Sequence, residues 1–160
     1  MQVKTYFKDD VSGDIFSTSP EGAEDFAENY ENPANLIHLE PTFCDGGGFN
    51  GKSSKIAFGK DLMFIRVLEI EEERTNNEME YLALITALTF GDEEELFLTD
   101  SKLVVNQINN NWKCNFKHLE RLRDIAKILL EKKKGVIMWC PREENLAGIK
   151  LDQLKKVRVK

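Results

Sequence analysis

Beyond residue 41 the chain passes from consecutive strand-like segments to alternating helices and strands, and this order restricts the fold more than any other feature. Strands are expected at 42–49, 55–58 and 62–70, with Gly59-Lys60-Asp61 as a turn. Helix-like and strand-like segments follow at 75–89, 96–99, 102–108, 117–132, 136–140 and 143–157. Strands joined by short turns pair antiparallel, whereas strands separated by helices pair parallel. The order therefore predicts an α/β fold with a five-stranded mixed sheet flanked by helices.

Local signals support the helices in this scheme. Thr75 and Glu78 match a capping box, in which the N-cap hydroxyl and the third helical residue exchange hydrogen bonds with the backbone. Gly135 is a suitable end for the long helix at 117–132. Apolar residues recur along that helix at helical spacing, at Leu119, Leu122, Ile125, Ala126 and Leu129. We therefore expect a long amphipathic helix there.

Residues 1–40 form a separate, acidic extension in this interpretation. Strands at 3–8 and 14–18, a helix from Ser19-Pro20 through Tyr30 and a strand at 35–40 give a small ββαβ-like unit. We thus expect two domains, 1–40 and 41–160. The extension carries no recognisable chemistry, so it is a structural or partner-binding appendage, or alternatively it takes part in substrate selection. Its partner is unknown from the sequence. His38 in the extension and the isolated His118 are expected to be structural.

The sequence also indicates a cellular setting. No run of apolar residues is long enough for a transmembrane helix, and the start, MQVKTYFKDD, lacks the apolar region of a secretory signal. Three widely spaced cysteines, Cys44, Cys114 and Cys140, match neither a disulfide framework nor a zinc site. We expect a cytoplasmic protein with reduced thiols and no membrane partner.

Charge is distributed unevenly along the chain. The formal net charge of −6 disfavours a nucleic-acid partner when taken alone. It combines −7 over residues 1–40, −8 over 41–101 and +9 over 102–160. Basic residues on the long helix, Lys117, Arg121, Arg123 and Lys127, would face solvent in any protein, and in a nucleic-acid binder some would contact phosphates. The net charge therefore does not exclude a nucleic-acid partner for the C-terminal part.

Three acids fall where a sheet of this kind collects ligands. Asp45 and Asp100 stand at the ends of expected strands, and Glu80 lies in the first turns of the capped helix. Convergent carboxylates repel one another unless cations neutralise them, and Mg²⁺ prefers such hard oxygen ligands. The residues alone indicate a candidate metal site, the alternative being ordinary solvated acids.

Four motifs in order resemble the ribonuclease HI family over about residues 41–157. Cys44-Asp45-Gly46-Gly47 resembles its first-strand motif, and Leu98-Thr99-Asp100-Ser101 its T-D-S motif. The segment Thr75-Asn76-Asn77-Glu78-Met79-Glu80-Tyr81 resembles its helix start. Trp139-Cys140-Pro141-Arg142-Glu143-Glu144-Asn145 resembles the W-V-P-R-E-x-N segment of the subgroup without a histidine loop. The resemblance implies a ribonuclease H-like fold.

The resemblance also implies a function. The family hydrolyses the RNA strand of RNA–DNA hybrids with two Mg²⁺ or Mn²⁺ ions, leaving 5′-phosphate and 3′-hydroxyl ends. By resemblance, Asp45 bridges both ions and Glu80 and Asp100 complete the catalytic metal ligands, whereas Glu78 fits the helix cap. Expected hybrid contacts are Gly46, Gly47, Asn76, Asn77, Ser101, Trp112 and Lys113. The alternative roles are a helix cap for the two asparagines, a turn for the two glycines, and core packing or a cap for Trp112.

The fourth acid of the family, in the pattern N-x-x-A-D, is missing. Its position falls on Ile149, or on Gly148 if one residue is absent. Asp152 stands about one helical turn further on and is a tentative replacement, with a solvated helix acid as the alternative. Glu144 is a weaker candidate. We therefore keep open a catalytically impaired module that binds nucleic acid or a protein partner, and a nuclease with another substrate.

Overall fold

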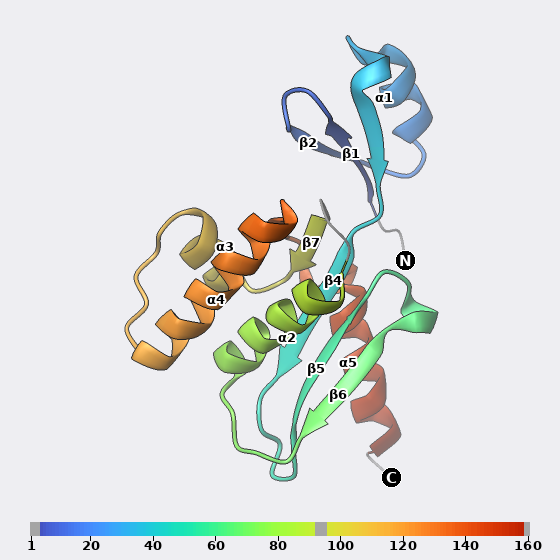
Figure 1. Cartoon of the computed structure of the whole chain (residues 1–160). Coiled ribbons are helices and arrows are strands. Elements are labelled where there is room, and N and C mark those ends of the chain that lie inside the picture. The colour runs from blue at the N-terminus through green and yellow to red at the C-terminus, as the bar shows by residue number, and fades with distance from the viewer. Residues whose placement is uncertain (1–3, 92–95, 159–160) are drawn as a thin grey trace. The chain divides into compact units, whose positions relative to one another are not determined.

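The computed structural model of the 160-residue chain describes residues 4–91 and 96–158 and divides into two compact units, Met1–Pro41 and Thr42–Lys160 (Figure 1). Residue 3, the first of the strand expected at 3–8, lies outside the described residues. Each unit has a sheet of its own, of three strands in the first and five in the second. No helix within the described ranges has the length and apolar character needed to cross a membrane.

The second unit contains the expected mixed sheet, with strand order β6-β5-β4-β7-β8. Its strands are β4 (Thr42–Gly47), β5 (Ser54–Gly59), β6 (Arg66–Ile70), β7 (Leu96–Thr99) and β8 (Val136–Trp139). β4 and β6 pair antiparallel with β5, whereas β7 pairs parallel with β4 and with β8. The predicted five-stranded mixed sheet, with three antiparallel strands followed by parallel ones, is confirmed, and β4 lies at its centre.

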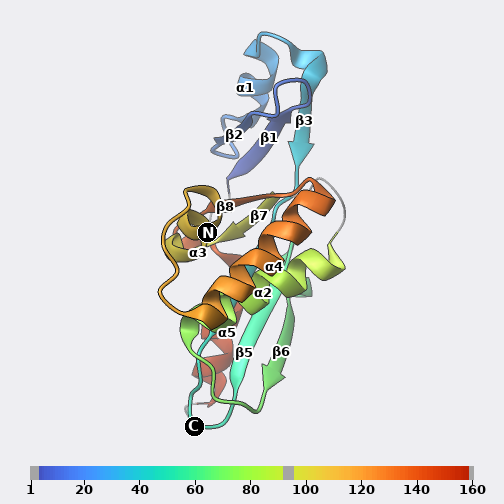
Figure 2. The same cartoon turned by 60° about the vertical axis from the view of Figure 1, so that its left-hand side comes forward.

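Helices cover both faces of this sheet (Figures 1 and 2). They are α2 (Asn76–Phe90), α3 (Lys102–Asn109), α4 (Lys117–Lys133) and α5 (Leu146–Arg158). Neighbouring residues of β4 show which face each helix takes. A Cβ on Gly46 would meet the backbone of Met79 in α2, whereas the nearest atom to a Cβ on Gly47 belongs to Leu151 in α5. Successive strand residues point to opposite faces, so α2 and α5 lie on opposite sides of β4.

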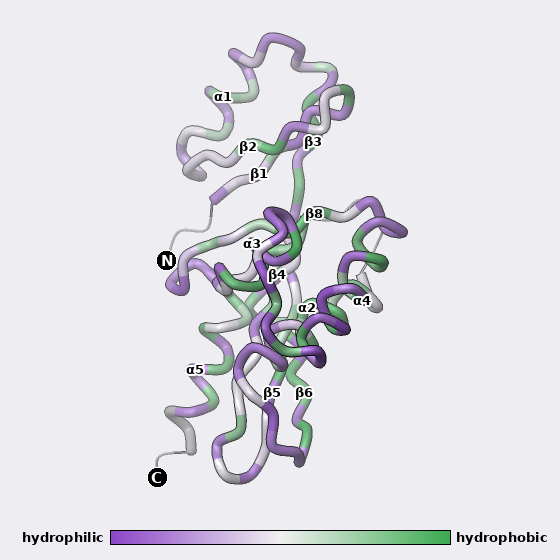
Figure 3. The backbone as a smooth tube through the Cα atoms, turned by 90° about the vertical axis from the view of Figure 1, so that its left-hand side faces the viewer, coloured by the Kyte–Doolittle hydropathy of each residue, from purple (hydrophilic) through white to green (hydrophobic). Residues whose placement is uncertain are grey.

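The main core fills the space between the sheet and α2, with α4 packed over α2. Its largest fully buried side chains include Tyr81, Phe97, Met79, Leu84 and Leu88. The Tyr81 hydroxyl donates a 2.5 Å hydrogen bond to Gln107 in α3, so the one polar atom of this ring is satisfied inside the core. Hydrophilic and hydrophobic residues alternate along α4, as predicted for an amphipathic helix (Figure 3).

In the second unit, three predicted boundaries differ from the observed ones by two residues or more. The last helix begins at Leu146 rather than at 143, because Arg142–Glu144 form a 3₁₀ turn and the Asn145 side chain accepts the Ala147 amide at 3.2 Å. The strand expected at 62–70 begins with the 3₁₀ turn Leu62–Phe64, which the Asp61 side chain caps, so β6 starts at Arg66. The strand expected at 42–49 ends at Gly47, because the Asn76 side chain accepts the Gly48 amide.

The first unit has the expected ββαβ order in β1 (Thr5–Asp9), β2 (Ile15–Thr18), α1 (Ala23–Asn29) and β3 (Leu36–Leu39). The helix is shorter than the predicted 19–30, and the 3₁₀ turn Pro33–Asn35 precedes β3. Its core is aromatic, with ring centroids 5.4–5.7 Å apart among Phe7, Phe16, Phe26 and Tyr30. The exposed His38 packs edge-on against Phe7.

The contact between β4 and α2 yields a stability prediction. A Cβ at residue 46 would lie 2.2 Å from the Met79 carbonyl carbon, whereas a Cβ at residue 47 would have its nearest neighbour at 4.0 Å. Because backbone cannot yield as a side chain can, Gly46→Ala should lower the free energy of unfolding by about 3 kcal/mol or more. Urea denaturation measures this, with Gly47→Ala as the matched control. Equal effects of the two substitutions would contradict the packing described here.

Candidate active site

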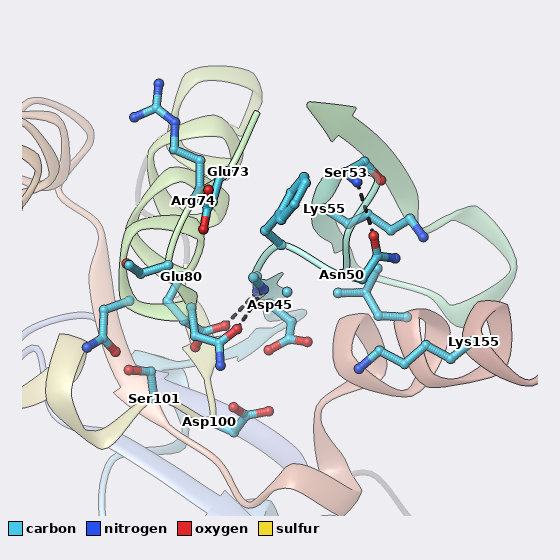
Figure 4. Close-up of a pocket in the computed structure, with 18 of the residues that line it drawn as sticks. Asp45, Asn50, Ser53, Lys55, Glu73, Arg74, Glu80, Asp100, Ser101 and Lys155 are labelled. Carbon is cyan, nitrogen blue, oxygen red and sulfur yellow. Dashed lines mark hydrogen bonds between the residues drawn. The ribbon is translucent and has the colours of Figure 1, made fainter. Parts of the chain in front are cut away.

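An open cleft of about 1050 Å³ lies in the second unit at the carboxyl ends of β4 and β7 (Figure 4). Asp45, Glu80 and Asp100 lie at its floor, and Arg74, Lys55 and Lys155 are among the cationic residues that line it. The topology explains the position of the cleft. β4 and β7 are adjacent and parallel, so the residues that end them meet at one edge of the sheet.

The three predicted carboxylates converge. Asp45, Glu80 and Asp100 each offer an oxygen, and these three oxygens lie within 4.8 Å of one another. Asp45 is 2% exposed and Glu80 9% exposed, whereas Asp100 is only partly buried. They come from a strand, a helix and a strand end that are far apart in the sequence. The long-range arrangement of the sheet and α2 is therefore what creates the cluster.

Glu80 and Glu78 have separate tasks at the start of α2. The Glu80 carboxylate accepts the Gly46 amide at 2.6 Å and the Thr99 hydroxyl at 3.5 Å, which fixes it against β4. Glu78 completes the capping box with Thr75 and pairs with Arg74 at 3.2 Å. The capping-box prediction for Glu78 is confirmed, and this side chain is engaged outside the carboxylate cluster.

Two further residues hold the cluster together, and sequence analysis assigned them no role. Arg142 Nη1 contacts Asp45 Oδ2 at 2.8 Å and Asp100 Oδ2 at 2.9 Å. The fully buried Asn145 donates from Nδ2 to the Cys44 carbonyl and to Asp100 Oδ2, both at 3.0 Å. Both residues follow β8, which is parallel to β7. Their place after the carboxyl end of a parallel strand is the sequence signal that could have identified them as site residues.

Burial and mutual repulsion govern the charges of the cluster. Burial, followed by the nearby Asp45 carboxylate, raises the pKa of Glu80 to about 9. Burial also raises the pKa of Asp45, although hydrogen bonds with Glu80 and Arg142 oppose that effect. Near neutral pH the metal-free cluster therefore keeps a proton on Glu80, in addition to the Arg142 cation beside Asp45 and Asp100.

Most of the predicted hybrid contacts line the same cleft, namely Gly46, Gly47, Asn76, Asn77 and Ser101. Asn76 and Ser101 also have local roles, because Asn76 accepts the Gly48 amide and Ser101 caps α3. Trp112 and Lys113 are not among the lining residues, since they belong to the connection between α3 and α4. Trp112 is 50% exposed there.

Asp152 and Gly148 lie beside the Arg142 side chain. Asp152 Oδ1 contacts Arg142 Nη2 at 3.2 Å, and Asp152 does not belong to the group of potential metal ligands found among the described residues. Ile149 is partly buried on α5. A Cβ on Gly148 would lie 2.6 Å from Arg142 Nη1. Glu144 ends the 3₁₀ turn that carries Arg142.

The donor set fits a hard divalent cation. All three convergent side chains offer carboxylate oxygens, which suit Mg²⁺ or Mn²⁺ rather than metals that prefer nitrogen or sulfur. The proton held on Glu80 and the guanidinium beside Asp45 and Asp100 indicate that the cluster is short of positive charge without a metal ion. Asp45, Glu80 and Asp100 are thus the residues that could hold an ion.

Comparison with known proteins supports the fold. The model of the RNase H family matches residues 40–145. RNase H1 of the halophilic archaeon Halobacterium salinarum shares 28% identity at a TM-score of 0.58, with 71% of this chain and 97% of that one covered. The N-terminal RNase H domain of a Mycobacterium tuberculosis protein shares 26% identity at a TM-score of 0.56, covering 73% and 96%. LC11-RNase H1, solved in complex with an RNA/DNA hybrid, shares the fold at 22% identity and a TM-score of 0.53, covering 72% and 98%.

The raised pKa of Glu80 predicts how stability depends on pH in the metal-free protein. An unfolded glutamate loses its proton near pH 4.5, whereas Glu80 in the folded state keeps it up to about pH 9. The folded state binds more protons between these values, so the free energy of unfolding should fall as pH rises from 5 to 8, by up to about 1.4 kcal/mol per pH unit. Urea denaturation in EDTA across this range measures the slope.

Glu80→Gln should flatten that slope, because glutamine stays neutral at every pH. Glu78→Gln is the matched control on the same helix. Burial raises the pKa of Glu78, but hydrogen bonds from Thr75 and Arg74 outweigh burial and lower it, so this group titrates below the range tested. An unchanged slope in Glu80→Gln would show that Glu80 is not the group responsible.

Proposed function

The chain belongs to the ribonuclease H family, and on that basis we propose that it hydrolyses the RNA strand of RNA–DNA hybrids with divalent metal ions. The observation that carries the proposal is the convergence of Asp45, Glu80 and Asp100 within 4.8 Å at the floor of an open cleft. We propose that these three residues are the catalytic metal ligands. Mg²⁺ and Mn²⁺ are the proposed ions.

We propose two ions at this site, with Asp45 shared between them. When bound, such ions supply the positive charge that stabilises the attacking and leaving oxygens of phosphodiester hydrolysis. The residues of the chain hold the ligands in place, since the Gly46 amide fixes Glu80 and Asn145 fixes Asp100. Water adds across the P–O3′ bond, leaving a 3′-hydroxyl on one RNA fragment and a 5′-phosphate on the other.

We propose that the hybrid lies along the cleft. Asn76, Asn77 and Ser101 offer polar groups beside the carboxylates, as recognition of an RNA 2′-hydroxyl requires, and Gly47 presents backbone without a side chain. Lys55, Arg74 and Lys155 line the same cleft and suit phosphate contacts. Trp112 and Lys113 are proposed as outer contacts, beyond the residues that line the cleft.

We keep the proposed division into an acidic extension, 1–40, and a catalytic domain, 41–160. It is supported by the two compact units and by the start of the family match at residue 40. The first unit has no proposed partner. A cytoplasmic location is also proposed, and the free state of Cys44, Cys114 and Cys140 is consistent with a reducing compartment.

Removal of one carboxylate tests the proposed function. With Mg²⁺ or Mn²⁺, the wild-type protein should cut a labelled RNA–DNA hybrid, and Asp45→Asn should reduce the rate by roughly three orders of magnitude, because the proposed shared ligand is lost. Glu131→Gln, which removes an exposed acid of α4, is the control and should retain activity. Hybrid binding without cleavage by the wild type, with either ion, would instead support a catalytically impaired binding module.

Asp152 remains the tentative fourth ligand of the sequence prediction. Its side chain is 48% exposed, and its carboxylate contacts the Arg142 guanidinium. If Asp152 ligates an ion, Asp152→Asn should raise the Mn²⁺ concentration needed for half-maximal cleavage by about tenfold or more. Titration of activity with Mn²⁺ measures this, and an unchanged requirement would remove Asp152 from the set of ligands.

A further inference from the structure

Arg142 joins carboxylates from three elements of the fold. A single nitrogen, Nη1, lies 2.8 Å from Asp45 Oδ2 and 2.9 Å from Asp100 Oδ2, while Nη2 lies 3.2 Å from Asp152 Oδ1. Asp45 is almost fully buried, so its pairing is poorly screened by water. The cation thus sits directly on oxygens that two of the proposed metal ligands offer.

Gly148 makes the room for this cation. It is buried in α5, and a Cβ there would lie 2.6 Å from Arg142 Nη1 and 2.9 Å from Cζ. Glycine inside a helix destabilises it by roughly 1 kcal/mol relative to alanine, so helix formation does not account for the residue. Space for the guanidinium does account for it. The next residue, Ile149, stands where the family pattern has an acid, and it brings no charge.

We propose that Arg142 is a built-in competitor of the divalent ion. In the metal-free protein its guanidinium offsets part of the negative charge of Asp45 and Asp100 and keeps the cluster assembled. A divalent ion that binds the same two oxygens must displace this guanidinium, because like charges repel at such short range. The Arg142 side chain is 45% exposed, so it can swing toward solvent. The inference rests on the proposed function, in that the cluster takes a divalent ion.

Calorimetric titration with Mn²⁺, without nucleic acid, tests the competition. Arg142→Gln removes the charge and should tighten Mn²⁺ binding by about tenfold, the equivalent of about 1.4 kcal/mol. In EDTA the same variant should melt at a lower temperature than the wild type, because the carboxylates lose their counter-charge. Arg142→Lys keeps a cation and should stay closer to the wild type in both measurements.

Arg74→Gln is the matched control, because Arg74 lines the same cleft but pairs with Glu72 and Glu78. It removes an equal charge without touching the cluster and should change Mn²⁺ affinity less than twofold. An equal gain in affinity for Arg74→Gln and Arg142→Gln would reduce the effect to general electrostatics and overturn the proposal.

A double-mutant cycle tests the role of Gly148. Gly148→Ala should push the guanidinium out and tighten Mn²⁺ binding as Arg142→Gln does, and the double variant should bind no more tightly than either single variant. Independent, additive effects would overturn the proposal, as would an unchanged Mn²⁺ affinity and melting temperature in Arg142→Gln. If the wild type and every variant fail to bind Mn²⁺, the proposed function itself fails and this inference falls with it.

Discussion

The close approach of α2 to β4 at Gly46 is the contact on which the site depends. Without a side chain at this residue, the backbone of Met79 and Glu80 comes close enough for the Gly46 amide to hold the Glu80 carboxylate at 2.6 Å. The same strand places Asp45 one residue earlier, and its parallel neighbour β7 brings Asp100 alongside. Any side chain at 46 would therefore separate the helix from the strand and the third carboxylate from the other two.

Bringing three carboxylates within 4.8 Å creates an electrostatic problem that the structure answers in two ways without a metal ion. Burial favours a proton on Glu80, and the Arg142 cation lies against Asp45 and Asp100. The uneven distribution of charge along the sequence reflects the composition of this site. The negative middle segment contains the whole cluster, while Arg142 and Lys155 come from the basic segment 102–160. The net charge of −6 averages over these opposing parts.

The order of elements could be predicted because it depends on local patterns, namely short turns, helical spacing and the Thr75 capping box. The capping box also distinguished the two glutamates. Because Glu78 caps the helix, its side chain cannot also reach β4, which left Glu80 as the predicted metal ligand. Arg142 and Asn145 could not be assigned roles in this way. Their partners Asp45, Asp100 and Cys44 lie about 40 to 100 residues away in the sequence, and they sit in a 3₁₀ turn and a cap that helical periodicity does not reveal. The same turn explains why the last helix starts later than predicted.

The absence of the fourth acid is related to the position of Arg142, whose guanidinium contacts Asp45, Asp100 and Asp152. The family pattern would place four carboxylates around the site, whereas this chain has three convergent carboxylates and a cation, with Ile149 at the family position and Asp152 beyond the guanidinium. Replacing that acid by an uncharged residue makes the site less negative by about one charge, while Arg142, which the family segment W-V-P-R-E-x-N shares, supplies the cation. Such a site attracts divalent ions less strongly and withstands their absence better. Gly148, Ile149 and Arg142 then act together. Gly148 leaves space for the Arg142 guanidinium, and Ile149 offers that guanidinium no carboxylate at the family position.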